Sequence, residues 1–128
     1  MIRSLATLAC ILALASAVPA FAGVSIGKPT FDPAPNEIVN AGAPVQFSVT
    51  GSHKSTESGE TPWITFVWNF GDGTPIRSQR YDGAGNHTDT VSHTFAQAGI
   101  YKVTVTGGHG FDLFGFKFFK TKTIEVAV

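Results

Sequence analysis

The chain has 128 residues, and its nine basic and nine acidic side chains cancel to a formal net charge of zero. This balance provides no basic face and argues against nucleic-acid binding. A single cysteine rules out a disulfide framework, and the length suits one domain with one core.

The first segment, 1–22, is typical of a secretory signal peptide. Arg3 supplies a positive n-region, Leu5 to Val18 is an apolar run too short for a membrane span, and Ala20-Phe21-Ala22 is a small-x-small cleavage site. We therefore predict cleavage near Ala22 and a mature domain over residues 23–128 that is secreted or periplasmic. An uncleaved N-terminal anchor is the alternative interpretation. No later apolar stretch approaches the ~20 residues of a membrane helix.

The mature region has the pattern of an all-β protein. Val, Thr and Phe are common, and a cluster of Gly, Pro or Asn recurs about every ten residues, which indicates a β-sandwich. Pro29, Pro33 and Pro35 restrict the first segment to the edge of a sheet. Alternating apolar and polar residues predict strands over 24–26, 45–50, 64–69, 76–81, 88–95, 101–105 and 121–128.

Two features disturb this pattern near the C-terminus. The run Gly107-Gly108-His109-Gly110 predicts a break in the strand that contains Tyr101. Further on, Lys120 and Lys122 share the phase of Ile124, a predicted core residue. Unbroken alternation would point both lysines inward, so either a bulge shifts the register or the hairpin projects beyond the sandwich end.

Two sequence blocks carry a family resemblance. The first is Trp68-Asn69-Phe70-Gly71-Asp72-Gly73-Thr74, and the second combines His93-Thr94-Phe95 with Gly99-Ile100-Tyr101-Lys102-Val103. In this order the blocks resemble the polycystic-kidney-disease (PKD) family of extracellular modules. The resemblance covers roughly Phe31 to Val128 and implies an all-β, Ig-like antiparallel β-sandwich of about seven strands, preceded by the signal peptide. The matching structural positions are Trp68, Phe70, Gly71, Asp72, Gly73, His93, Gly99 and Tyr101.

Two departures from the family separate this chain from a typical member. The segment Arg77–Asp89 is longer than the usual link, and the final hairpin carries phenylalanines in place of a short polar turn. Family members are generally modules within larger surface proteins and secreted hydrolases.

Asp72 and His93 are the candidates for catalysis. An aspartate between two glycines after a strand is expected to be a turn residue, and we expect His93 to hydrogen-bond across that turn. An acid–base pair in a small secreted hydrolase is the alternative, but no nucleophile or oxyanion hole stands at a recognisable spacing. We therefore predict no catalytic residue. Tyr101, close behind Gly99, matches a tyrosine corner, whose hydroxyl bonds backbone across the corner.

Metal binding has weak support in the sequence. Some proteins of this fold bind calcium through acidic loop residues, and calcium requires several converging oxygens. The acidic candidates Glu57, Glu60, Asp82 and Asp89 form no convergent set, and the four histidines lack zinc-site spacing. We expect no cofactor, with calcium as the open alternative.

The phenylalanine-rich hairpin is the strongest candidate for binding. Only alternate residues of a sandwich strand face the core, and the adjacent Phe118 and Phe119 must point to opposite faces. Residues 111–119 hold six large apolar side chains, which are more than one face can bury: Phe111, Leu113, Phe114, Phe116, Phe118 and Phe119. Exposed apolar patches mark interaction sites. The alternative is that the hairpin folds back and caps the open end of the sandwich. The predicted binding residues are Phe111, Leu113, Phe114 and Phe116, with the aromatic residues Trp63 and Tyr81.

These observations predict a non-catalytic binding module at the cell surface. Aromatic faces on a rigid sandwich suit protein surfaces and sugar rings alike, so the expected partner is an envelope protein or a polysaccharide. A self-associating structural surface protein is the alternative, and a small secreted hydrolase is the third hypothesis.

Overall fold

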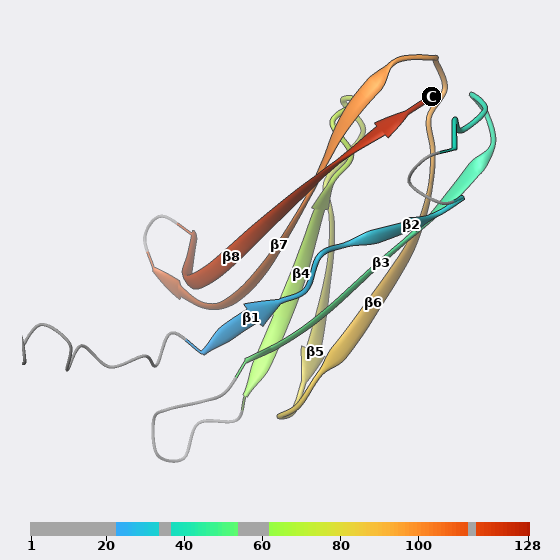
Figure 1. Cartoon of the computed structure of the whole chain (residues 1–128). Coiled ribbons are helices and arrows are strands. Elements are labelled where there is room, and N and C mark those ends of the chain that lie inside the picture. Colours follow the sequence, from blue (N-terminus) through green and yellow to red (C-terminus); the bar gives the residue numbers. More distant parts are fainter. Residues whose placement is uncertain (1–22, 34–36, 54–61, 113–114) are drawn as a thin grey trace, which may run out of the picture.

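The computed structural model describes residues 23–33, 37–53, 62–112 and 115–128, without the side chains of residues 111, 112, 116 and 117. The predicted signal peptide lies outside these residues. The described chain forms eight strands and no helix, and therefore contains no helix long and apolar enough to cross a membrane. The strands are β1 Val24–Ile26, β2 Thr30–Asp32, β3 Pro44–His53, β4 Trp63–Asn69, β5 Arg77–Asp82, β6 His87–Thr94, β7 Ile100–Asp112 and β8 Gly115–Ala127 (Figure 1).

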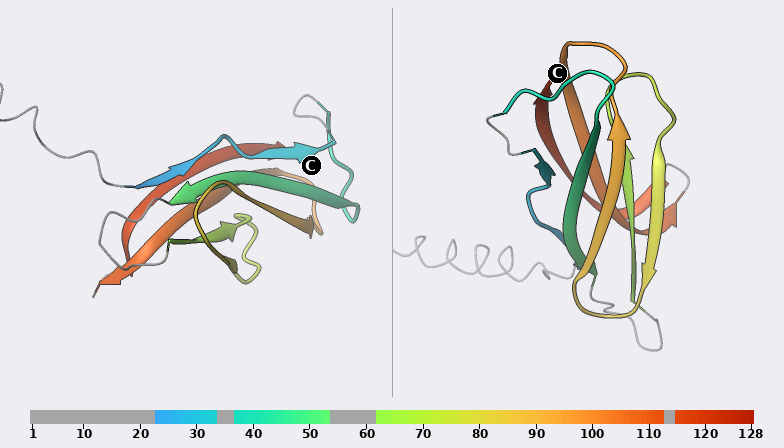
Figure 2. Two further views of the ribbon diagram at one scale, coloured as in Figure 1. Left: turned by 90° about the horizontal axis from the view of Figure 1, so that it is seen from below. Right: turned by 90° about the vertical axis from the view of Figure 1, so that its right-hand side faces the viewer.

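The strands form two antiparallel sheets packed as a sandwich, which confirms the predicted fold class. In the first sheet β3 lies at the centre, with β1 and β2 in succession along one side and β6 along the other. In the second sheet the order is β5-β4-β7-β8. Figure 2 shows β1 and β2 on the same side of the sandwich as β8, with β5 and β6 on the opposite side. Each side of the sandwich therefore brings together one edge of each sheet.

The core lies between the sheets and follows the alternation of the sequence. Trp68 from β4 and Phe47 from β3 are fully buried, with ring centroids 5.9 Å apart. Phe47 also contacts Phe31, Phe70 and Phe95 at centroid distances of 5.3–6.4 Å. Burying large aromatic side chains contributes much of the hydrophobic stabilisation of such a small domain.

The strand break predicted at Gly107–Gly110 is wrong, because β7 continues from Ile100 through these glycines to Asp112. The glycine at 107 makes room for the opposite sheet. A Cβ built on Gly107 would lie 2.5 Å from Cγ2 of Ile26 in β1 and 3.3 Å from Cδ1 of Ile64. The glycine therefore serves a close approach between layers instead of ending the strand.

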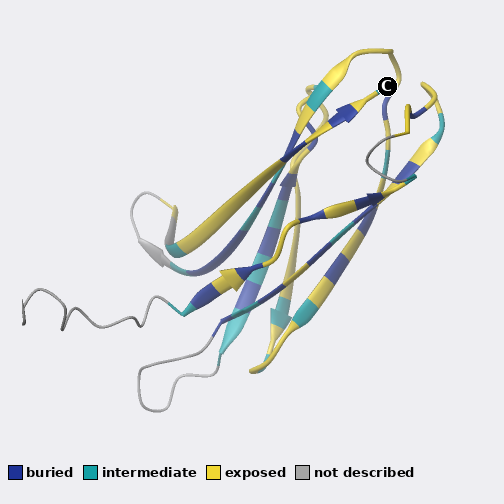
Figure 3. Cartoon of the chain, viewed as in Figure 1, coloured by how far each residue is buried: buried dark blue, intermediate teal, exposed yellow. Residues whose placement is uncertain are grey.

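The inward phase of Lys120 and Lys122 is explained by the position of β8 at the edge of its sheet. β8 pairs with β7 in one unbroken register between Phe118 and Ala127, so no bulge occurs there. Lys120 and Lys122 keep the inward phase of Ile124, yet both are exposed. Both lysine side chains therefore reach solvent at the edge of the sheet, although β1 of the opposite sheet approaches β8. Figure 3 shows β8 exposed along much of its length.

Candidate functional site

The Gly71–Gly73 turn is held by the Asp72 carboxylate. Its Oδ1 accepts hydrogen bonds from the backbone N–H and the hydroxyl of Thr74, and its Oδ2 lies 2.7 Å from Nε2 of His93. The His93 ring stacks on Phe70 with a centroid distance of 3.9 Å. Gly71 has a φ of 74°, in the left-handed region that glycine adopts most readily. The turn is thus tied to β6 by a side-chain bridge, in the arrangement expected from the sequence.

These contacts lower the pKa of Asp72. Burial alone would raise the pKa of this carboxyl, but the hydrogen bonds from Thr74 and His93 and the charge of His93 outweigh it, so the pKa falls below 3.8. The Asp72 carboxylate thus joins Thr74 of the turn to His93 of β6. We call this arrangement the Asp72 clamp.

A buried carboxylate, that of Asp89, joins the two sheets. Asp89 of β6 is 1% exposed; its Oδ2 accepts a 2.7 Å hydrogen bond from Nε1 of Trp68, and its Oδ1 a 2.8 Å bond from the Tyr81 hydroxyl. Burial, followed by the hydrogen bond to Asp89 and the charge of that carboxylate, raises the pKa of Tyr81 above 10. Tyr81, a predicted binding residue, thus has its hydroxyl committed within the sandwich, and its ring packs edge-on against Phe66.

The acidic candidates for calcium are placed apart or lie outside the described residues. Glu57 and Glu60 belong to the segment that is not described. Asp82 forms an ion pair with Arg80, and Asp89 is occupied by its two donors. Across the described parts of the chain, no three His, Cys, Asp or Glu side chains converge as a metal site requires.

The corner before β7 has the geometry of a tyrosine corner. The Tyr101 hydroxyl donates a 2.7 Å hydrogen bond to the carbonyl of Gln97, and the Tyr101 ring stacks on Phe95 at 4.6 Å. Gly99 exchanges two backbone hydrogen bonds with Val128, which ties the corner to the end of β8.

Aromatic rings fill the end of the sandwich beneath the β7–β8 hairpin. His109 of β7 is buried, and its ring stacks on that of His53 at a centroid distance of 3.5 Å. Nδ1 of His109 lies 2.8 Å from the carbonyl oxygen of Trp63, and the indole of Trp63 packs on the same ring at 4.4 Å. The guanidinium of Arg80 lies 4.3 Å from the Trp63 ring. Trp63, also a predicted binding residue, is therefore packed between neighbours.

The hairpin itself combines core and surface. Phe118 is half-buried near His53, whereas Phe119 is 60% exposed, so the two adjacent rings point to opposite faces as the alternation predicts. The predicted binding side chains Phe111, Leu113, Phe114 and Phe116 lie outside the described residues. Their role in binding stays a prediction.

A row of threonines lies on the outer face of β7 and β8, beside the Lys102–Glu125 pair. The Thr106 and Thr121 hydroxyls lie 3.0 Å apart, and those of Thr104 and Thr123 lie 3.3 Å apart. Phe119 follows Thr121 on the same face, opposite Gly108. We call these four threonines and Phe119 the threonine face; it is uncharged and carries one exposed ring.

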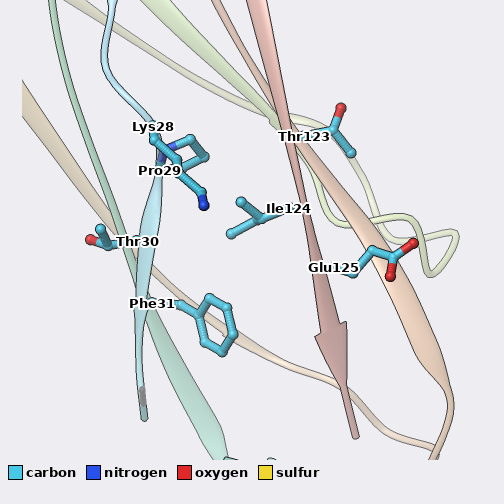
Figure 4. A pocket seen from close by; sticks show the side chains of 7 residues that line it. All are labelled: Lys28, Pro29, Thr30, Phe31, Thr123, Ile124 and Glu125. Carbon is cyan, nitrogen blue, oxygen red and sulfur yellow. The ribbon is translucent and has the colours of Figure 1, made fainter. Parts of the chain in front are cut away.

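An open groove lies where the edge strand β8 of one sheet faces β2 at the edge of the other sheet. A pocket of about 390 Å³ lies between β2 and β8, and Figure 4 shows Ile124 pointing from β8 toward Pro29 and Phe31. Thr123 and Glu125 point away from it in the same view. Pro29, Phe31 and Ile124 give the groove an apolar lining, and the Lys28 side chain extends from the β2 side toward Ile124 in this view. We call this space the β2–β8 groove; sequence analysis missed it, and its one signal was the inward phase of Lys120 and Lys122.

The fold and both motif blocks agree with a comparison against protein families. The family described as PKD domain matches residues 30–110, which is more than half of the chain. The chain belongs to the PKD domain family. PKD domains are generally non-catalytic interaction modules and typically extracellular. A search of curated proteins finds no match.

Proposed function

We propose that this PKD domain is a secreted or periplasmic module that binds a protein partner at the cell surface. It acts through the β2–β8 groove and the adjoining β7–β8 hairpin, and it performs no catalysis. The open edge of β8 carries this proposal. β8 is a long strand at the end of its sheet, and an apolar groove lies directly beside it.

Open strand edges are a known mode of protein recognition. The unpaired backbone N–H and C=O groups of an edge strand form a template for a further strand, and pockets beside it select side chains. The exposed ring of Phe119 extends the apolar surface at the hairpin end. The sequence-predicted side chains Phe111, Leu113, Phe114 and Phe116 belong to the same hairpin and would enlarge this surface.

A matched pair of variants at Thr123 tests the edge. Gly99 and Val128 form a hydrogen-bonded pair, so by alternation the N–H of Thr123 points away from β7. Thr123→Pro removes this N–H, and the β7–β8 ladder keeps its bonds. Thr123→Ala retains that N–H, and both variants lose the contact with the Thr104 hydroxyl. Immobilised wild type and both variants, each purified from the full expressed chain, are used to capture proteins from a cell-surface extract. Partners kept by Thr123→Ala and lost from an equally stable Thr123→Pro support the proposal; identical capture by all three refutes it.

A polysaccharide is the second candidate ligand, favoured by the threonine face. Its hydroxyl rows are uncharged, and Phe119 offers an exposed ring that suits a sugar face. Binding to a panel of insoluble polysaccharides that is lost in Phe119→Ser and retained in Phe119→Tyr would favour this alternative.

A further inference from the structure

We propose that the β2–β8 groove binds an extended acidic segment of the partner protein as an additional antiparallel strand next to β8. Lys120, Lys122 and Ile124 select the sequence of that segment. This inference rests on the proposed protein-binding function and names the chemistry of the partner.

The backbone of β8 determines which residues would pair with the added strand. Gly99 and Val128 exchange both of their backbone hydrogen bonds, so by alternation the even-numbered residues of β8 bond to β7. The N–H and C=O groups of Thr121, Thr123 and Glu125 therefore point to the open edge. At Ala127 this edge is already used, because its carbonyl accepts a 3.0 Å bond from the N–H of Val39. An added strand would thus occupy the stretch of β8 before Ala127.

The inward side chains of this stretch carry the selectivity. Relative to an added antiparallel strand, Lys120, Lys122 and Ile124 would occupy non-hydrogen-bonded pairs, in which opposing side chains are closest. Both lysines are exposed, and the ion pairs of the described chain do not include them. Acidic residues opposite the lysines and an apolar residue opposite Ile124 are the complementary choice. Read from its N-terminus, the segment has the pattern apolar-x-acidic-x-acidic.

The pocket supplies the place for the apolar residue. A side chain opposite Ile124 would enter the space that Pro29 and Phe31 line from the other sheet (Figure 4). Phe31 is 8% exposed and Ile124 9%, so the floor is formed by core side chains that keep a small exposed area. Lys28, which also lines this space, adds a further positive charge.

The same lysines argue against a second copy of this chain as the occupant. Directly opposed residues of two antiparallel strands lie on one face of the sheet. The inward residues of β8 from Phe118 onward are Phe118, Lys120, Lys122, Ile124 and Val126, and none is acidic. Pairing two β8 strands would therefore place these lysines on one face without an acidic partner. Edge lysines commonly prevent such self-pairing, and here they leave the edge open to an acidic strand.

Three short synthetic peptides test the pattern, with the full-length protein in fluorescence anisotropy titrations. The first peptide contains the sequence Val-Thr-Glu-Thr-Glu. In the second peptide lysine replaces both glutamates, and in the third peptide serine replaces the valine. We expect the first peptide to bind about tenfold more tightly than the second, because two close charge pairs change from attraction to repulsion. The serine peptide should also bind more weakly than the first.

A charge-reversed protein provides the decisive control. In the Lys120→Glu, Lys122→Glu double variant, the preference should reverse toward the lysine peptide, and an unchanged melting temperature will show that these exposed positions do not affect folding. Equal binding of all peptides, or a preference that survives charge reversal, overturns the inference. Poly-glutamate that binds regardless of Thr123→Pro would show attraction by charge alone and would also overturn it.

The outcomes separate this inference from the proposed function. If the peptides fail but captured proteins are still lost from Thr123→Pro, the edge binds a partner of different sequence and only the acidic pattern is wrong. If neither peptides nor captured proteins depend on Thr123→Pro, the proposed protein-binding function fails as well.

Discussion

The indole N–H of Trp68 donates a 2.7 Å hydrogen bond to the Asp89 carboxylate, and both residues are buried. Trp68 lies in β4 and Asp89 in β6, so this bond joins the two sheets across the core. The second oxygen of Asp89 accepts from Tyr81 in β5. One carboxylate thereby fixes three strands.

Replacing Asp89 should strongly destabilise the domain. Asp89→Ala leaves the buried Trp68 N–H and the part-buried Tyr81 hydroxyl without their acceptor. Each such loss costs about 1–3 kcal/mol, so we expect a total of about 2–6 kcal/mol. Tyr81→Phe removes one donor together with its need for an acceptor and should cost only about 1 kcal/mol. Urea unfolding of both variants measures these free energies. An Asp89→Ala loss no larger than that of Tyr81→Phe would contradict the linking role.

The phenol of Tyr81 should titrate above its ordinary value. Burial, the Asp89 hydrogen bond and the Asp89 charge raise its pKa above 10, while Arg77 acts in the opposite direction. The folded state therefore keeps this proton to higher pH than the unfolded state, and the contribution of Tyr81 to stability is present below about pH 10 and lost as pH rises through the raised pKa. The near-ultraviolet phenolate absorbance of the wild type minus that of Tyr81→Phe isolates this titration, because Tyr101 is the chain's other tyrosine. In Asp89→Asn the transition should move toward lower pH, and an unmoved transition would assign the shift to burial alone.

The strand framework could be predicted because apolar alternation and the two motif blocks are local signals. The Asp72–His93 bridge and the Tyr101–Gln97 bond followed from residues at fixed positions beside turns. Asp72 lies within a turn, and His93 and Tyr101 belong to the second motif block. The family resemblance is specific at these positions, so it made both contacts predictable.

The role of Asp89 could not be predicted in this way. Its partners Trp68 and Tyr81 belong to the opposite sheet, and only the packing of the layers brings them together. The stacking of His53 on His109 is hidden for the same reason. Strand β2 was not predicted either, because the prolines around it obscure the alternation. The groove depends on which strands form the edges, and sequence order alone does not determine that.

Acid should weaken the Asp72 clamp. Hydrogen bonds from Thr74 and His93 outweigh burial and hold the pKa of Asp72 below 3.8. The unfolded state thus binds this proton first as pH falls, so the contribution of Asp72 to stability is present above pH 3.8 and lost as pH falls through the lowered pKa. The difference in unfolding free energy between wild type and Asp72→Asn should shrink below about pH 4. A difference that stays constant through this range would show that the carboxylate charge does not stabilise the turn.

Gly107 and Ile26 should be energetically coupled across the layers. In Gly107→Ala the new methyl group would lie 2.5 Å from Cγ2 of Ile26, and relieving such overpacking costs about 1–3 kcal/mol. Ile26→Ala removes the obstructing atoms and destabilises the domain by itself through lost burial. In the Ile26→Ala background, however, Gly107→Ala should cost much less than in the wild type, and a double-mutant cycle of unfolding free energies measures the coupling. Strictly additive effects would show that the glycine at 107 serves backbone conformation and not the approach of β1.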